Sequence, residues 1–125
     1  VTLVGIRAAR AAFDAPDGRL RSALRRHHGG NTDAMFNAWA DVWLDPDFAR
    51  LDIRDQLPRV TAPVLAIQGD GDEYGTPRQL DLIAEGVAGP VETWLVPDCR
   101  HVPHHQAADR VLPRIAEFVR RRRPG

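Results

Sequence analysis

Two short segments of this sequence contain side chains that could carry out acid–base chemistry. They hold four carboxylates, one thiol and two imidazoles, in residues 69–76 and 97–104: Asp70, Asp72, Glu73, Asp98, Cys99, His101 and His104. A carboxylate that accepts a hydrogen bond from an imidazole fixes its tautomer and stabilises the imidazolium, so the imidazole can take a proton from a nucleophile. The residue types therefore predict two members of a charge-assisted triad. Spacing alone allows any acid of residues 69–76 to be the partner of a histidine.

Each of these segments follows a short apolar run. Residues 63–68 (PVLAIQ) and 91–96 (VETWLV) have the composition of strands buried on both faces of a parallel sheet. Residues 77–87 between them have apolar side chains at helical spacing and a proline at the first helical position. A right-handed crossover makes the strands parallel, so both loops leave the same edge of the sheet, where ligands and catalysis gather. A carboxylate and an imidazole 29 residues apart, such as Asp72 and His101, can therefore meet.

These two loops also carry a family resemblance. The string VLAIQGDGDEYGT, followed further along by PDCRHVPHHQ, resembles the carboxy-terminal part of the α/β-hydrolase superfamily. In that family one strand ends in a Gly-x-x-Asp loop and the next in a loop that bears a histidine. The resemblance implies that Asp72 is the triad acid and His101 the base, and it leaves Asp70 as a turn-capping residue. In one departure, the position before the histidine, often glycine in the family, is Arg100, which places a cation beside the base.

The resemblance extends upstream and implies the fold class. The string MFNAWADVWLDPDFARLDIRDQLPRVTAPVL resembles the end of a helical cap and the return of the chain into the core. We therefore expect an α/β fold: the carboxy-terminal portion of an α/β-hydrolase sheet, two parallel strands with helices, preceded by helical cap segments. Residues 1–58 are expected to form the cap or lid segment, and residues 59–125 the carboxy-terminal part of the core.

A nucleophile for the triad is missing from this pattern. The family needs a nucleophile on a strand-to-helix elbow, commonly Gly-x-Ser-x-Gly, upstream of the acid. Ser22 is the only serine, and its surroundings, RLRSALRR, predict a basic helix without glycine. We therefore expect a fragment or truncated product that is inactive alone. Its expected partners are the missing amino-terminal half of the hydrolase core or, in an oligomer, a second copy of the chain.

Aromatic side chains follow one face of a predicted cap helix. Helices are expected over residues 1–13, 19–28 and from 31 or 32 to about 44. In the third, Phe36, Trp39 and Trp43 lie at helical spacing and face one way. Such stripes more often pack a helix onto its neighbours. The alternative is that they line a substrate pocket and bind an apolar part of the substrate.

A metal site and a cysteine nucleophile are the rival chemistries. Cys99, His101, His104 and His105 lie within seven residues and are all zinc-ligand types. They come from a single loop, whereas structural zinc sites usually join two spaced pairs, so we predict no metal and no cofactor. Cys99 is disfavoured as a nucleophile because side chains near one another on an extended loop diverge; it is expected to be a small buried residue.

Composition limits the remaining function classes. Seventeen basic and seventeen acidic residues give no net charge, which argues against nucleic acid or an anionic membrane as a partner. The arginines of residues 120–123 are expected to be the solvated end of a last helix over residues 106–120. No apolar run is long enough for a membrane span. One cysteine agrees with a reducing compartment, so a cytoplasmic location is expected, and the absence of lysine suggests a GC-rich, bacterial genome.

Together these observations predict a fragment of an α/β-fold hydrolase. We expect Asp72 and His101 to serve hydrolysis of an ester-like small-molecule substrate if the missing nucleophile is a serine. An aspartate nucleophile would use the same acid and base on epoxides or haloalkanes. A non-catalytic binding or interaction module is the third alternative, because two parallel strands alone leave an unpaired edge that favours association.

Overall fold

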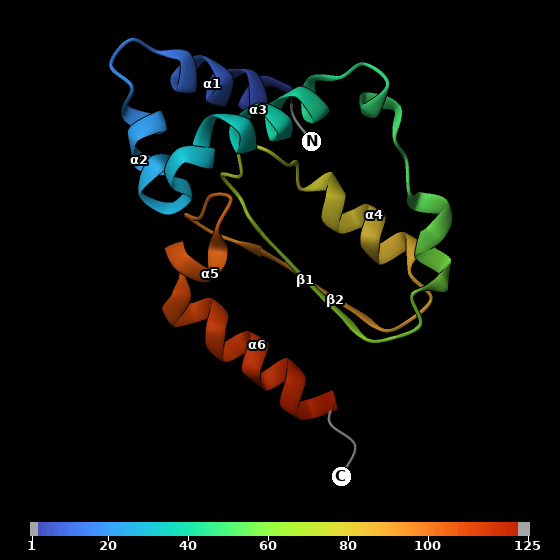
Figure 1. The fold of residues 1–125 in the computed structure, drawn as a ribbon. Helices are drawn as coiled ribbons and strands as arrows, with labels where there is room; N and C mark the ends of the chain where they lie inside the picture. Colours follow the sequence, from blue (N-terminus) through green and yellow to red (C-terminus); the bar gives the residue numbers. More distant parts are fainter. Residues whose placement is uncertain (1–2, 123–125) are drawn as a thin grey trace. The chain divides into compact units, whose positions relative to one another are not determined.

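The polypeptide divides into two units, Val1–Leu51 and Asp52–Gly125, in a computed structural model that describes residues 3–122 (Figure 1). The predicted boundary after residue 58, between a cap segment and a core segment, stays a prediction. Residues 52–58 contain all but the last residue of η3 (Arg54–Arg59), a 3-10 helix that packs against α4 (Arg78–Gly86). Leu57 lies so close to Gly86 that a Cβ there would be 2.6 Å from the Leu57 Cδ1. The absence of a side chain at Gly86 therefore lets Leu57 pack closely against α4, which belongs to the second unit.

The first unit is helical in its described part, residues 3–51. Its elements are α1 (Leu3–Asp14), α2 (Arg19–His28), η1 (Gly29–Asn31), α3 (Thr32–Leu44) and η2 (Phe48–Arg50). The Phe13 ring of α1 stacks on the Phe36 ring of α3 with centroids 3.8 Å apart, and Ala40 is fully buried beside them. These helices agree with the sequence prediction; the expected start of the first at Val1 lies outside the described residues.

The second unit is built on two parallel strands, as the apolar runs predicted. They are β1 (Val64–Gly69) and β2 (Val91–Val96), with α4 between them in the sequence. Val64 pairs with Val91 at one end, and Gly69 pairs with Val96 at the other. The loops after both strands therefore begin at the same edge. Within residues 52–122, β1 is paired only with β2, so its other edge is open.

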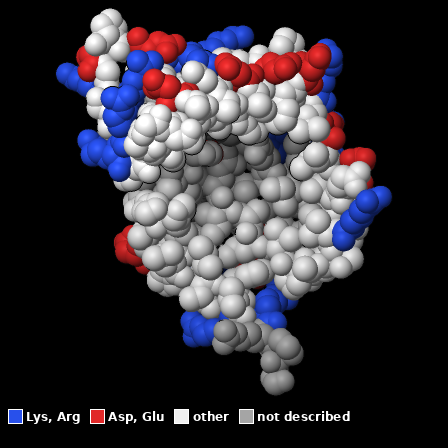
Figure 2. Space-filling model, in the orientation of Figure 1, with Lys and Arg blue, Asp and Glu red and all other residues white. Residues whose placement is uncertain are grey.

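Helices cover both faces of the strand pair. Paired residues of parallel strands point to the same face, so Ile67 and Trp94 share one face. There α6 (Ala108–Arg122) packs through Val111, while α4 packs on the strands through Leu80. Figure 1 shows the strands between α4 and α6, and Figure 2 shows few charged side chains over the strands in the same view.

The last predicted helix, over residues 106–120, corresponds to α6 (Ala108–Arg122). A separate short helix, α5 (Pro103–Gln106), precedes it and is divided from it at Ala107. The break lets the Ala107 side chain enter the core with Val96, Cys99 and Val111, and it lets Gln106 turn back toward the preceding loop. No helix in residues 3–122 is long and apolar enough to cross a bilayer.

The arginines near the end of α6 have a specific acceptor. Glu92, on the face of β2 that α6 covers, accepts hydrogen bonds from Arg114 at 2.7 Å, Arg121 at 3.0 Å and Arg122 at 3.4 Å. The sequence predicted a solvated helix end, and Arg120, Arg121 and Arg122 are exposed. Arg121 and Arg122 also bind the half-buried Glu92 carboxylate, which attaches α6 to the sheet. Arg123 lies outside the described residues.

Candidate active site

Asp72 lies in the loop that leaves β1, and its carboxylate accepts hydrogen bonds from several directions. Oδ1 accepts the backbone N–H groups of Tyr74 at 2.8 Å and Gly75 at 3.2 Å. Oδ2 accepts the side-chain amide of Gln68 at 3.2 Å. The short span of the loop makes this possible, because an aspartate readily accepts from the backbone two residues on. These three donors fix the orientation of the Asp72 carboxylate independently of His101.

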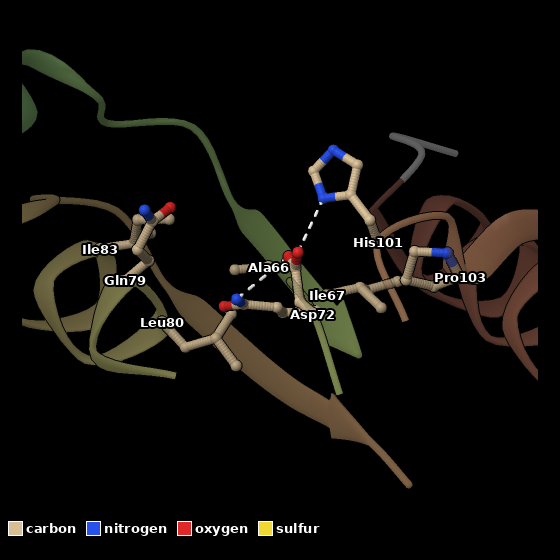
Figure 3. Close-up of a pocket in the computed structure, with 9 residues that line it drawn as sticks. Ala66, Ile67, Asp72, Gln79, Leu80, Ile83, His101 and Pro103 are labelled. Carbon is tan, nitrogen blue, oxygen red and sulfur yellow. Dashed lines mark hydrogen bonds and ion pairs between the residues drawn. The ribbon is translucent and has the colours of Figure 1, made fainter. Parts of the chain in front are cut away.

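His101 lies in the loop that leaves β2, and its ring meets that carboxylate. Its Nδ1 is 2.9 Å from the Asp72 Oδ1, as Figure 3 shows. The Asp72 side chain is 9% exposed, whereas the His101 side chain is 52% exposed. The ring edge packs against Tyr74, with centroids 4.7 Å apart. An ionised carboxylate only accepts hydrogen bonds, so Nδ1 carries the proton and the neutral ring keeps a lone pair on Nε2.

The electrostatics of Asp72 favour the ionised state. Burial alone raises the pKa of this carboxyl. The hydrogen bonds from the Tyr74 N–H, from His101 and from the Gly75 N–H, together with the charge of His101, outweigh burial and hold the pKa of Asp72 below its usual value of 3.8. The carboxylate is therefore charged near neutral pH and can stabilise an imidazolium.

Close approach of the two loops depends on Gly69, the last residue of β1. A Cβ at this position would lie 2.2 Å from the carbonyl oxygen of Arg100 and 2.3 Å from that of Cys99. Two further bonds join the loops: the Gly71 N–H donates to the Cys99 oxygen at 2.9 Å, and the Cys99 N–H donates to the Asp70 Oδ1 at 3.3 Å. The loop after β2, which carries His101, thus packs directly against the loop after β1, which carries Asp72.

The three acids of the first loop have different partners. Asp72 meets His101, Asp70 accepts from the Cys99 backbone, and Glu73 forms an ion pair with Arg100 at 3.2 Å. The cation before the histidine is therefore directed toward Glu73. Within residues 3–122, Asp98 is the one non-glycine residue with a positive φ, at 52°, so the position of Arg100 does not require glycine.

A groove of about 250 Å³ opens beside this pair (Figure 3). Its walls combine apolar side chains from β1 and α4 with polar side chains: Ala66, Leu80, Ile83, Gln79, Asp72 and His101. In Figure 3 the second ring nitrogen of His101 points away from Asp72. His101 thus has one ring nitrogen hydrogen-bonded to Asp72 and one that points away from it.

The other predicted site residues, the three aromatics of α3, belong to the first unit. Phe36 is 4% exposed, and its ring centroid is 5.5 Å from that of Trp39; Trp43 packs edge-on against Phe48. All of these contacts are made within the first unit. Substrate binding by the three aromatics therefore stays a prediction.

The rival chemistries find little support in the geometry. Cys99 is 2% exposed in the core of the second unit, which is unsuited to attack on a substrate. Its Sγ lies 3.7 Å from the Gln106 Oε1. Within residues 3–122, no three side chains of His, Cys, Asp or Glu form a group that could hold a metal ion. His104 and His105 are in α5, with their rings beside one another.

Sequence reasoning did not single out Gln68, Tyr74 or Gln106, which all contact the acid–histidine pair or its loops. Gln68 had a signal, because it is a polar residue at the end of an otherwise apolar strand. Gln106 and Tyr74 had none, since their contacts depend on how the two loops meet.

Comparison with known proteins identifies the fold. No protein-family model and no curated protein matches this sequence significantly. The crystal structure of proline iminopeptidase from Mycobacterium smegmatis matches 95% of this chain and 51% of its own, with a TM-score of 0.54 and 22% identity. The crystal structure of the enol-lactonase from Burkholderia xenovorans LB400 matches 93% of this chain and 50% of its own, with a TM-score of 0.53 and 22% identity.

This chain therefore spans about half the length of these solved structures. Both are α/β-hydrolases, and the likeness covers the carboxy-terminal part of their fold. The predicted fold class, a partial α/β-hydrolase sheet with two parallel strands and helices, is confirmed.

Proposed function

We propose that this chain supplies the acid and the base of an α/β-hydrolase triad, with Asp72 as the acid and His101 as the general base. The observation that carries the proposal is the 2.9 Å hydrogen bond between the buried Asp72 carboxylate and the Nδ1 of the half-exposed His101. The lone pair on Nε2 is left for a proton from a nucleophile. A surface histidine without a catalytic role would not need a carboxylate held by three other donors.

The proposed reaction is acyl transfer on an ester-like small molecule. His101 takes the proton of a serine hydroxyl as the oxygen attacks the acyl carbon, and it then returns that proton to the leaving group. Water repeats the cycle to release the acid product and restore the serine. The two solved structures are named as a peptidase and a lactonase, and both names describe attack on an acyl carbon, which favours this chemistry for the present chain.

The serine must come from a partner segment, because Ser22 lies inside helix α2 and not on a strand-to-helix turn. The proposed partner is the amino-terminal half of a hydrolase core, in the same polypeptide or in a second one. Two features of the second unit support such a partner. The outer edge of β1 is open within residues 52–122. On α6, Leu112, Ile115 and Val119 form an exposed apolar stripe, with Leu112 51% exposed.

The test is ester hydrolysis by the complete polypeptide that contains this chain, with p-nitrophenyl acetate as substrate. His101→Ala is expected to lower kcat by about 1,000-fold or more, in the range found for loss of a triad member. His105→Ala, a nearby exposed histidine in α5, is the matched control and should keep its activity. Unchanged turnover in His101→Ala would remove the proposed function.

A further inference from the structure

The side chain of Gln106 holds the backbone on both sides of His101. Its Oε1 accepts the N–H of Arg100 at 2.9 Å and the N–H of Val102 at 3.3 Å. We propose that Gln106 is a positioning residue, which sets the direction of the His101 ring without touching the substrate. This role rests on the proposed function of His101 as the base.

Two hydrogen bonds in opposite directions join Val102 and Gln106 and close residues 102–106 into a ring. The Val102 carbonyl accepts the backbone N–H of Gln106 at 2.9 Å, while the Val102 N–H donates to the Gln106 side chain. A side chain that reaches back to the N–H before its own helix is the arrangement of a capping box, here from one residue further along. The backbone of residues 100–102 is thereby tied to the first turn of α5.

The ring is in turn anchored to the core. Ala107, the residue after Gln106, is buried with Val96 and Val111. Its N–H donates to the Pro103 oxygen at 2.9 Å, and its own oxygen accepts from Val111 at 2.8 Å. The packing of α5 and α6 therefore sets the position of the Gln106 side chain. Through its hydrogen bonds, that side chain sets the position of the backbone around His101.

Without the Gln106 oxygen, the N–H groups of Arg100 and Val102 would lose the side-chain acceptor that the described residues give them. The site is solvent-exposed, so water can satisfy both donors and folding should change little. Water imposes no fixed direction, however. The loss should therefore appear in the orientation of His101 toward Asp72 and the groove, and not in overall stability.

The contacts on the other side of the loop do not duplicate this role. The Asp70 carboxylate and the Gly71 N–H both bind the backbone of Cys99, two residues before the base. Among the side-chain acceptors of the described residues, Gln106 alone binds the backbone N–H groups of the two residues that flank His101. The base is thus held at Nδ1 by Asp72 and through its neighbours by Gln106.

The experiment compares Gln106→Met, which has a similar length and no strong acceptor, with Gln106→Glu, which keeps an oxygen in place. In the complete polypeptide, Gln106→Met is expected to lower kcat for p-nitrophenyl acetate by about 10- to 100-fold with KM unchanged, since misplacement by about 1 Å can cost 100-fold. Gln106→Glu should stay within about threefold of the parent because the acceptor remains. Gln56→Met, an exposed glutamine on η3, is the matched control.

A second readout does not depend on catalysis. Amide hydrogen exchange at Arg100 and Val102 should become faster in Gln106→Met and stay slow in Gln106→Glu, with equal melting temperatures for the three proteins. Unchanged kcat and unchanged exchange in Gln106→Met would overturn the positioning role, and so would equal losses of kcat in the Met and Glu variants. If His101→Ala keeps full activity while exchange at Arg100 rises in Gln106→Met, the proposed function fails but the hold of Gln106 on the loop stands.

Discussion

His101 and Asp72 are 29 residues apart in the sequence, yet the His101 Nδ1 lies 2.9 Å from the Asp72 Oδ1. The parallel pairing of β1 and β2 makes this contact possible, because Gly69 and Val96 end the two strands side by side. Both loops therefore start from one edge of the sheet. The short loop after β1 presents the Asp72 carboxylate, and the loop after β2 brings the His101 ring to it.

Gly69 is expected to be essential for this contact. A methyl group in Gly69→Ala would collide with the backbone oxygens of Arg100 and Cys99, which cannot move as a flexible side chain can. Forcing the loop away should cost about 1–3 kcal/mol of unfolding free energy and should separate His101 from Asp72. Urea unfolding and ester hydrolysis measure the two effects.

Gly71→Ala is the control for that variant, because its Cβ would be at an ordinary distance of 3.4 Å from the Cys99 oxygen. It should change the unfolding free energy by less than about 0.5 kcal/mol. Equal destabilisation by the two substitutions would contradict the close-approach explanation.

Acid should destabilise the second unit through Asp72. The pKa of Asp72 is lower in the folded protein than its ordinary value of 3.8, so the unfolded chain binds the proton more readily. Its contribution to stability is complete above the unfolded value and is lost as the pH falls below about 4. Urea unfolding from pH 6 to pH 3 should show a steeper loss for the parent than for Asp72→Asn. Parallel curves for the two proteins would contradict this origin of the acid sensitivity.

Gln68 is expected to support the acid. Its side-chain amide is buried at the end of β1 and donates to the Asp72 Oδ2 at 3.2 Å. Gln68→Met keeps the size of the side chain but removes the donor, so the carboxylate loses one of the groups that fix its direction. We expect kcat for ester hydrolysis to fall by about 10-fold, in line with loss of one hydrogen bond to a charged group.

Gln79→Met provides the comparison for Gln68, since Gln79 lines the groove on α4 but its side chain has no hydrogen bond to Asp72 among the described contacts. A fall of equal size in both variants would point to a general effect of the groove. Only a loss confined to Gln68→Met supports a specific role in holding the acid.

Glu92 should stabilise the attachment of α6 to the sheet in a salt-dependent way. Burial raises the pKa of Glu92, but the hydrogen bonds and charges of Arg121, Arg114 and Arg122 outweigh it, and the pKa is lowered. Glu92→Gln should therefore lower the melting temperature at low ionic strength. The difference from the parent should shrink in 1 M NaCl, because salt screens exposed charges. A difference that does not depend on salt would mean that packing, and not charge, explains the effect.

The sequence by itself determined the local features of this protein. Apolar runs of six residues marked both strands, and helical spacing marked α1, α3 and α4. The positions after each strand marked the two loops, within which only the family resemblance selected Asp72 and His101. These features depend on residues that are neighbours along the chain, so their periodicity is visible without coordinates. The separation of α5 from α6 escaped this reasoning, because the core position of Ala107 outweighs the local helical pattern.

Only the tertiary structure decided which side chain meets which. It directs Asp70 to the Cys99 backbone, Glu73 to Arg100 and Gln106 to the N–H groups that flank His101. Side-chain types predict that such groups need partners but not which partner is within reach, since one turn or bend in a loop changes the distances by several ångströms. Partner choice in this site follows from the meeting of two loops that the sequence separates and the sheet brings together.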